Sequence, residues 1–448
     1  MAHYLSEIIL GGIIISKKIF IYTNWTCLRR KLDARKLANY FVKNKNAIVY
    51  DPRKADILLL ITCAFTDQRT EQCIQQINNF KKYPGELIIA GCLPLINPER
   101  FHEVFNGRWI VTKEIEKIDN LFPKHKIKFT EIPDANIPWV NFDLTRSFES
   151  IKEFSKRSKI IQKIYNNIDS FARNTILFRT AAGAWYGIST KNPYYLQPSR
   201  GCKGNCAYCA IYKAIGTIKS KPLNEIIEEF QNGLAQGFKN FILDSDDIGG
   251  YGIDIGSSFT EMLEKLTSFE GNYSFDIHNL HPHWIIKHIE AIEKILSKGK
   301  IRRILSSIQS GNPRILKLMH RYTDTKKLKD AYTRMKKACP SLLLETECIC
   351  GFPTETMEEF NETLDFIIDV GFGWGAIFPF SCKAGTAAEK IEPKIDDFEI
   401  TRRIKYAKKY LRINGFDTCY PKFTRKRSQG ILDFGDINFL NNTIFQSN

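Results

Sequence analysis

The chain has 448 residues, which suits two or three domains that each bury a core of their own. Its 12 cysteines are too sparse for a secreted disulfide scaffold, and no apolar run approaches the roughly 18 residues of a membrane span, so we predict a cytoplasmic protein that contacts no membrane. The formal net charge of +16 would favour a polyanionic partner such as RNA, but the charge is spread along a lysine-rich chain, so a nucleic-acid surface and a purely compositional origin both stay open.

After an N-terminal extension over residues 1–17, the first half of the chain alternates buried strands with helices. The strands are expected at Lys18–Thr23, Asp56–Ile61 and Leu87–Ala90, and the helices near Ala34–Lys45 and Gln68–Tyr83. Strands that alternate with helices predict a doubly wound parallel sheet, in which loops at the carboxyl ends of the strands form the ligand crevice. We assign this α/β domain to residues 18–122.

A cysteine follows each of these three strands, namely Cys27, Cys63 and Cys92. Because the carboxyl ends of parallel strands share one edge of the sheet, the three thiols are predicted to converge there. Cys73 lies within the second helix and is left over as a helix thiol. The sequence therefore predicts a three-cysteine cluster site in this domain.

Residues 123–192 are assigned to a linker. Between Ser147 and Ala172 apolar side chains recur at helical spacing with lysines between them, which predicts an amphipathic helix. These side chains are Ile151, Phe154, Ile161, Ile164, Tyr165, Ile168 and Phe171. The helix is expected either to pack on a core or to dock a substrate.

A second cysteine triad, Cys202, Cys206 and Cys209, lies in one glycine-bearing loop just after a strand at Tyr194–Gln197. Three thiolates at C-x3-C-x2-C spacing can each bind one iron of a 4Fe–4S cube, which leaves the fourth iron open to a non-protein ligand. Zinc would normally need a fourth protein ligand, and the next histidine is as distant as His278. A redox pair of Cys206 and Cys209 would leave Cys202 unexplained. We therefore favour an iron–sulfur cluster over zinc and over buried structural thiols.

The second half of the chain repeats strand and helix. Further strands are expected at Asn240–Leu243, Tyr273–Ile277, Arg302–Ile308, Leu342–Cys350 and Gly375–Phe380, with helices near Leu223–Gln236, Pro282–Lys298, Thr323–Lys337 and Met357–Val370. Together with the strand before Cys202 they form six units. This predicts a partial (β/α)6 barrel of the TIM type over residues 193–395, with its site at the carboxyl ends of the strands.

Titratable and thiol side chains occur near those strand ends. Glu345 and Glu347 share one face of their strand, and we expect Cys348 and Cys350 on the same face as small buried hydrophobes. His281 belongs to a histidine cluster that is expected to cap the barrel mouth rather than to act in catalysis.

The cysteine loop resembles the radical S-adenosylmethionine (SAM) superfamily, in which an aromatic residue, here Tyr208, precedes the last cysteine. With the first triad, the chain is similar to the methylthiotransferase family, which includes tRNA 2-methylthio-adenosine synthases and enzymes that methylthiolate an aspartate of a ribosomal protein. The other motifs that carry the resemblance are Gln309-Ser-Gly311, Leu316-Lys-Leu-Met-His-Arg321, Gly351-Phe-Pro-Thr-Glu-Thr356, Phe378–Ala387, Tyr251-Gly252 and His281-Pro282. The resemblance covers about residues 18–120 and 195–395.

The resemblance implies two 4Fe–4S clusters, one on each cysteine triad, and SAM as the cosubstrate. It implies that one SAM methylates sulfur at the first cluster, while a second SAM yields the radical that abstracts a substrate hydrogen, so that an unactivated C–H becomes C–S–CH3. An electron donor such as flavodoxin or ferredoxin is implied as a partner. The expected SAM contacts are Tyr208, Gln309, Ser310, Glu347, Gly351, Phe352 and Pro353.

The chain departs from the family pattern at several positions beside the cysteines. Thr26 and Ile61 stand where the family usually has Gly and Asn, and Leu305 and Ser307 replace its His-x-Pro. Asp246-Asp247 stands in place of a common Gln-Asp. All six cluster cysteines are retained.

Residues 396–448 begin with a helix expected over Phe398–Asn414. The residues that follow, 415–448, are too few for the RNA-binding β-barrel that tRNA-modifying members carry. The basic stretch at 422–427 is expected to be a solvated tail or an RNA or peptide contact. We therefore lean toward a peptide or protein substrate and keep tRNA as the alternative. Two further alternatives are a radical SAM enzyme whose auxiliary cluster relays electrons or binds substrate, and a non-catalytic RNA-binding protein.

Overall fold

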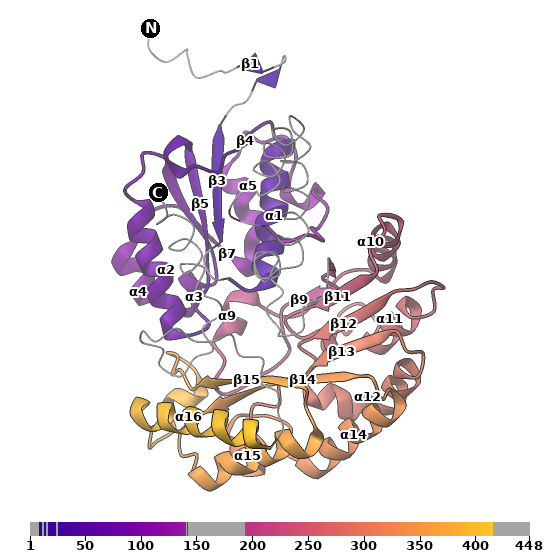
Figure 1. Ribbon diagram of the computed structural model, residues 1–448. Coiled ribbons are helices and arrows are strands. Elements are labelled where there is room, and N and C mark those ends of the chain that lie inside the picture. The colour runs from indigo at the N-terminus through magenta and orange to yellow at the C-terminus, as the bar shows by residue number, and fades with distance from the viewer. Residues whose placement is uncertain are drawn as a thin grey trace, which may run out of the picture. The chain divides into compact units, whose positions relative to one another are not determined.

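The computed structural model describes residues 9–10, 13–14, 17–23, 26–139, 141 and 193–414 (Figure 1). The chain divides into two compact units, Met1–Ala184 with Ile211–Gly216, and Trp185–Ala210 with Thr217–Asn448. The amphipathic segment expected over 147–172 and the basic stretch at 422–427 lie outside the described residues. Among the described residues, no helix combines the length and the apolar character needed to span a membrane.

The first unit contains a five-stranded sheet in which all neighbouring strands are parallel. Its strand order is β4 (Ala47–Ile48), β3 (Lys18–Thr23), β5 (Ile57–Thr62), β6 (Glu86–Gly91) and β7 (Trp109–Val111). The helices are α1 (Leu28–Lys43), α2 (Asp67–Phe80), α3 (Leu93–Ile96), α4 (Pro98–Val104) and α5 (Ile118–Leu121), with α9 (Ile211–Ile215) in the same unit. The doubly wound parallel sheet expected from the sequence is confirmed.

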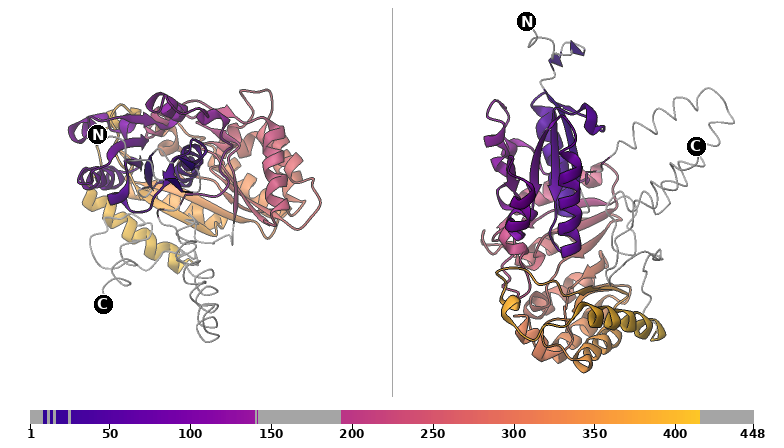
Figure 2. Two further views of the ribbon diagram at one scale, coloured as in Figure 1. Left: turned by 90° about the horizontal axis from the view of Figure 1, so that it is seen from above. Right: turned by 90° about the vertical axis from the view of Figure 1, so that its left-hand side faces the viewer.

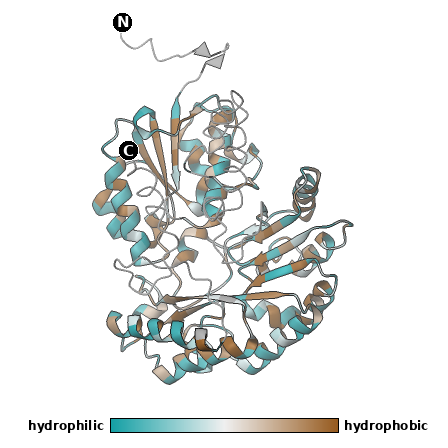
Figure 3. Ribbon diagram, viewed as in Figure 1, coloured by the Kyte–Doolittle hydropathy of each residue, from teal (hydrophilic) through white to brown (hydrophobic). Residues whose placement is uncertain are grey.

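Alternate residues of β3 face opposite sides of this sheet, and each side is covered by a helix. Ile19 and Ile21 belong to the core that α1 shares, whereas the ring of Phe20 packs in a tilted arrangement against that of Phe80 of α2, with the ring centres 5.6 Å apart. Every residue of β5 is buried, as expected for a central strand covered on both faces. In Figure 3 the strands are largely brown, and the helices show both colours, as amphipathic helices on a sheet do.

Helix α1 begins at Leu28, directly after Cys27, which is six positions earlier than the sequence analysis placed it. The first turn is rich in basic residues that interrupt the apolar period. Arg30 is nevertheless buried, because its Nε pairs with Asp33 Oδ2 at 2.7 Å. The early start places Cys27 at the N-cap of the helix.

The second unit contains a six-stranded sheet, again parallel throughout (Figure 2). Its order is β15 (Trp374–Pro379), β14 (Leu343–Cys350), β13 (Ile301–Leu305), β12 (Ser274–His278), β11 (Asn240–Asp244) and β8 (Tyr194–Leu196). The helices are α10 (Leu223–Ala235), α11 (Phe259–Leu266), α12 (Pro282–Leu296), α13 (Pro313–Leu318), α14 (Thr325–Ala338), α15 (Met357–Val370) and α16 (Asp397–Ile413). This is the partial (β/α)6 architecture expected from the sequence, with the short helices α11 and α13 in addition.

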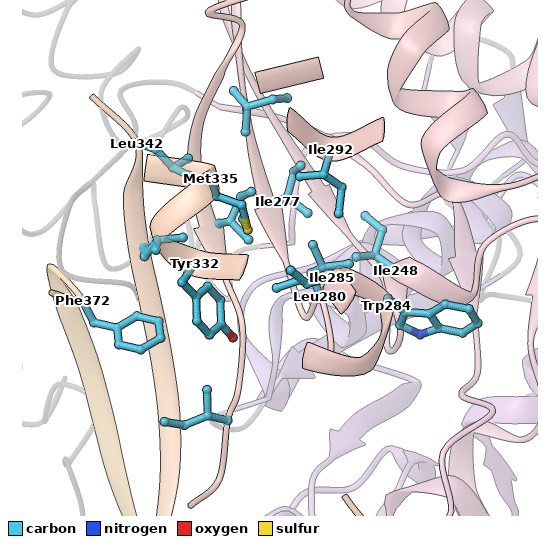
Figure 4. Close-up of a cluster of buried hydrophobic side chains, with 14 of the residues drawn as sticks. Ile248, Ile277, Leu280, Trp284, Ile285, Ile292, Tyr332, Met335, Leu342 and Phe372 are labelled. Atoms are coloured by element: carbon cyan, nitrogen blue, oxygen red, sulfur yellow. The ribbon is translucent and has the colours of Figure 1, made fainter. Parts of the chain in front are cut away.

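One face of this sheet packs against the helices through a continuous apolar core. Figure 4 shows part of it, including Ile277, Tyr332, Met335 and Phe372. Cys348 and Cys350 belong to this core. The expectation that they share a face with Glu345 and Glu347 is therefore wrong, because the pleat of a regular strand sends odd and even positions to opposite sides.

The opposite face of the sheet is charged at its centre. Arg303 Nη2 lies 2.9 Å from Asp276 Oδ2, and Arg303 Nη1 lies 3.2 Å from Glu345 Oε1. All three side chains are almost completely buried. Burial raises the pKa of Glu345 to about 7, although Arg303 opposes this shift. The guanidinium of Arg303 on β13 thus bridges carboxylates from the strands on either side, β12 and β14.

Replacing Arg303 by Ala should lower the free energy of unfolding by roughly 3–5 kcal/mol, because buried Glu345 loses the cation that it pairs with and buried Asp276 keeps only Arg302. Without Arg303 the pKa of Glu345 rises further above its unfolded value, so the carboxyl group binds a proton more tightly in the folded state. The difference in unfolding free energy between wild type and Arg303→Ala should therefore become smaller as the pH falls from 8 to 6. Urea unfolding followed by circular dichroism at both pH values measures this, and equal differences would contradict it.

Candidate functional site

The loop that carries Cys202, Cys206 and Cys209 folds its three thiols toward one another. Gly204 N–H donates to Cys202 Sγ at 3.1 Å, and a Cβ at Gly204 would lie 3.2 Å from Cys202 Sγ and 3.7 Å from Cys206 Sγ. The pKa of the Cys202 thiol is raised, first by burial, then by Asp247, and further by Cys206 and Cys209. The structure thus brings together the three cysteines that the spacing predicted to act as one set.

The end of β11 holds the first part of this loop through three consecutive residues. Ser245 Oγ accepts Ser199 N–H at 3.1 Å, and Asp246 Oδ2 accepts Gly201 N–H at 2.9 Å. Asp247 Oδ2 then lies 3.8 Å from Cys202 Sγ. The Asp246-Asp247 pair, noted in the sequence only as a departure from the family pattern, therefore anchors the cysteine loop.

Asp247 is fully buried and meets polar groups from another segment. Trp284 Nε1 donates to its Oδ1 at 2.9 Å, and His281 Nδ1 lies 4.0 Å from the same oxygen. Burial raises the pKa of Asp247 to about 6, against the effect of the Trp284 hydrogen bond. Cys202, Asp247 and His281 offer ligand atoms within 4.8 Å of one another. Since Cys202 already belongs to the cysteine triad, this group is part of the same site.

An apolar cluster lies beneath the cysteine loop. It contains Ala207 and, packed against it, Tyr208 from the loop, with Met319 and Phe352 from the two motif segments that follow β13 and β14. Phe352 is completely buried and contacts Phe380 edge-on at 5.5 Å. Tyr208 and Phe352 thus contribute to the packing that supports the loop.

Gln309, Ser310 and Glu347 were also expected to contact SAM, and they differ in how exposed they are. Gln309 and Glu347 are partly exposed at neighbouring strand ends, where Gln309 N–H donates to Glu347 O at 2.9 Å and Ser307 Oγ donates to Glu347 Oε2 at 2.9 Å. Ser310 is buried, and its hydroxyl lies 3.1 Å from Thr363 Oγ1 of α15. Gln309 and Glu347 are therefore the better placed of these three to reach a ligand.

Gly351 is required by local packing. Its φ is +82°, and a Cβ would lie 2.3 Å from Cγ1 of Ile400 in α16. Its N–H donates to Glu355 Oε2 at 2.7 Å. Gly351 and Pro353 are buried, so the loop that begins here is held firmly against α16.

The first unit also assembles its thiols at the carboxyl ends of strands. Cys27 follows β3, Cys63 follows β5 and Cys92 follows β6. Cys27 is exposed, Cys63 is partly buried and Cys92 is buried. Burial raises the pKa of Cys63, and Cys92, Cys27 and Cys73 raise it further, which places all four thiols in one neighbourhood.

Cys73 differs from the other three in what its sulfur contacts. Its Sγ accepts Cys63 N–H at 3.3 Å and lies 3.2 Å from Cys63 O, so it bonds the backbone on both sides of Cys63. The sequence analysis set Cys73 aside as a helix thiol. Its position in α2 is confirmed, and its contact with Cys63 was not foreseen.

Comparison with known proteins assigns a family to each unit. Residues 196–367 match the Radical SAM superfamily, and residues 18–112 match the Uncharacterized protein family UPF0004. The ribosomal protein uS12 methylthiotransferase RimO of Thermodesulfovibrio yellowstonii is 28% identical, over 86% of this chain and 80% of that protein. A probable threonylcarbamoyladenosine tRNA methylthiotransferase of Pyrococcus abyssi is 26% identical, over 83% of this chain and 79% of that protein.

A solved structure supports the fold. The radical S-adenosylmethionine methyltransferase TsrM of Kitasatospora setae, with cobalamin and a [4Fe-4S] cluster bound, superimposes with a TM-score of 0.56 at 11% identity, over 84% of this chain and 74% of that chain. Two matching domains in this order, together with curated relatives along most of the chain, confirm the resemblance read from the sequence. Along most of its length, the chain is similar to the radical SAM methylthiotransferases.

Proposed function

We propose that this radical SAM methylthiotransferase inserts a methylthio group at an unactivated C–H of a macromolecular substrate, using two 4Fe–4S clusters and two molecules of SAM. The observation that carries the proposal is the presence of two separate cysteine triads, one at the carboxyl ends of three parallel strands in the first unit and one within a single loop of the second unit. A reaction that needed only one cluster would leave one triad without a role.

The donor set of the second unit suits a cluster with one open iron. Cys202, Cys206 and Cys209 supply three thiols within one short loop, and Gly204 N–H already donates to one sulfur. Backbone donors of this kind stabilise thiolates and tune iron–sulfur clusters. We assign these three cysteines as the ligands of the cluster that binds SAM.

The donor set of the first unit fits the same chemistry. Cys27, Cys63 and Cys92 come from three strand ends, and Cys27 is the N-cap of α1, so the positive end of the helix dipole lies beside that thiol. Lys31 also interacts with Cys27. Burial lowers the pKa of Lys31 to about 8, and the Cys27 thiolate opposes this shift. We assign these cysteines to the auxiliary cluster.

When bound, the cluster on Cys202, Cys206 and Cys209 supplies the electron for reductive SAM cleavage, and the cluster on Cys27, Cys63 and Cys92 supplies a sulfur that accepts a methyl group. The protein contributes binding and orientation. Glu347 and Gln309, partly exposed at their strand ends, are proposed to bond polar groups of SAM. Asp247 and its partner Trp284 fix the loop on which SAM would be bound.

We propose a peptide or protein segment as the substrate. Six arginines of the described residues are already paired with carboxylates, in the pairs Arg53–Asp51, Arg100–Glu71, Arg108–Glu86, Arg314–Glu359, Arg334–Glu293 and Arg402–Glu399. Paired arginines are poor phosphate ligands, and scattered lysines give affinity without specificity. A peptide laid along a site needs backbone and side-chain pockets instead. A flavodoxin-like or ferredoxin-like protein is proposed as the electron donor.

The alternative substrate is tRNA, since one of the relatives carries that activity in its name. Mass spectrometry of digested tRNA and of the proteome, from cells with and without the gene, decides between the two. We expect one peptide to lose the mass of a methylthio group when the gene is deleted, while the tRNA nucleosides stay unchanged. A methylthio-adenosine that disappears from tRNA beside an unchanged proteome would reverse the assignment.

Because the triads lie in different units, their clusters should be lost independently. Anaerobically reconstituted protein should hold about eight irons, as two cubes require. Ala at Cys202, Cys206 and Cys209 should abolish reductive SAM cleavage. Ala at Cys27, Cys63 and Cys92 should leave cleavage measurable and abolish methylthio transfer.

Iron analysis and quantification of 5'-deoxyadenosine test this pair of variants. If Ala at Cys27, Cys63 and Cys92 changed neither iron content nor product, the auxiliary site would be misassigned. If that variant still released a modified product without sulfur, the auxiliary cluster would serve electron relay or substrate binding, as in other radical SAM reactions.

Cys73 provides a control within the first unit. Cys73→Ser should keep iron content and methylthio transfer close to wild type, since a hydroxyl can make both hydrogen bonds to the Cys63 backbone. Cys73→Ala should lower iron occupancy, because those two bonds are lost. Loss of one full cluster in the Ser variant would show that Cys73 is itself a ligand.

A further inference from the structure

Arg321 lies just beyond α13 and is directed by the turn that ends this helix. His320 has a left-handed φ of 56°, and Arg321 N–H bonds Leu316 O at 2.8 Å, which closes the helix end. The guanidinium is also fixed, because Nη2 donates to Ser307 O. Both the backbone and the side chain of Arg321 are therefore held in place.

The residues on this turn contact the cysteine loop in succession. Met319 O accepts Ala207 N–H at 3.0 Å, and His320 Nδ1 lies 3.1 Å from Asn205 O. Arg321 then reaches the thiol between these two loop positions, with Nη1 3.5 Å from the sulfur of Cys206. The guanidinium thus meets the loop as part of an interlocking set of contacts.

The positive charge of Arg321 has little local compensation. Within the part of the chain that the structure describes, no carboxylate lies within ion-pair distance of its guanidinium. Asp247 raises the pKa of Arg321 only through longer-range electrostatics, and its effect is smaller than those of Tyr208 and Cys206. Nη1 is also 3.5 Å from His281 Nδ1, which brings no negative charge. Of these two side-chain atoms 3.5 Å from Nη1, the sulfur of Cys206 is the one able to carry a negative charge.

We infer that Arg321 is a positioning residue that donates a hydrogen bond to the Cys206 thiolate and raises the reduction potential of the cluster proposed on Cys202, Cys206 and Cys209. The inference rests on that proposed ligand set. Reduction adds one negative charge to a cluster, and a neighbouring cation with an N–H···S bond stabilises the more negative state. Removing Arg321 must then make the cluster harder to reduce.

The experiment uses the full chain with Ala at Cys27, Cys63 and Cys92, so that only one cluster contributes to the signal. The anaerobically reconstituted protein is titrated electrochemically, and the reduced cluster is followed by electron paramagnetic resonance. Arg321→Ala should shift the midpoint to a more negative potential at unchanged iron content. Arg321→Gln should fall between wild type and Ala, because it keeps donors but loses the charge, and Arg321→Lys should remain nearest to wild type.

Arg314, on the helix α13 that precedes Arg321, provides a matched control. It bonds Glu359 and Thr354, away from the thiols, so Arg314→Ala should leave the potential unchanged. A full iron content with a wild-type potential in Arg321→Ala would overturn the inference. If Arg321→Ala failed to hold iron, equal potentials in the Gln and Lys variants would overturn it instead.

Failure of the inference is distinguishable from failure of the proposed ligand set. If the background protein with intact Cys202, Cys206 and Cys209 assembled no cluster, the ligand assignment itself would fail. If it assembled a cluster whose potential ignored Arg321, only the role of this arginine would be lost.

Discussion

The backbone of Ala207 is hydrogen-bonded on both sides, and the geometry of the second triad depends on it. Its N–H donates to Met319 O at 3.0 Å, and its carbonyl accepts Ala388 N–H at 2.8 Å. A loop with three cysteines and little side-chain bulk has few contacts of its own with which to order itself. Two peptide hydrogen bonds to distant segments, with the apolar cluster below, supply that order. The segments after β13, β14 and β15 thus act first as supports for the loop.

The fold follows closely from the sequence because strand and helix periods are strong in both halves. The three strands expected in the first unit and the six in the second are present, and all pair in parallel. The helix boundaries and short helices that the sequence analysis missed have local causes, which the hydrophobic period of the sequence does not reveal. A buried Arg30 paired with Asp33 concealed the first turn of α1, and the shortness of α11 left too few residues for a helical period to show.

The cysteines of the site could be predicted from the sequence, whereas most of the residues that surround them could not. Spacing and strand ends identified all six proposed ligands, since covalent chemistry restricts the residue type. The residues that hold the loop are ordinary polar side chains, and Asp247 and Arg321 meet it only after the chain has crossed the sheet. The one available signal was position. Asp247 follows β11 and Arg321 follows β13 with its helix, at the edge of the sheet where the parallel fold gathers its loops.

Helix α9 has a consequence for how the chain can be divided. Its residues, with Gly216, are counted with the first unit, although the chain on both sides of them belongs to the second. No single cut can therefore separate the two units without removing α9 from one of them. During synthesis the first unit cannot be complete until residue 216 has left the ribosome, by which time the loop of Cys202, Cys206 and Cys209 has also emerged. The second set of thiols is therefore already outside the ribosome when the first unit becomes complete.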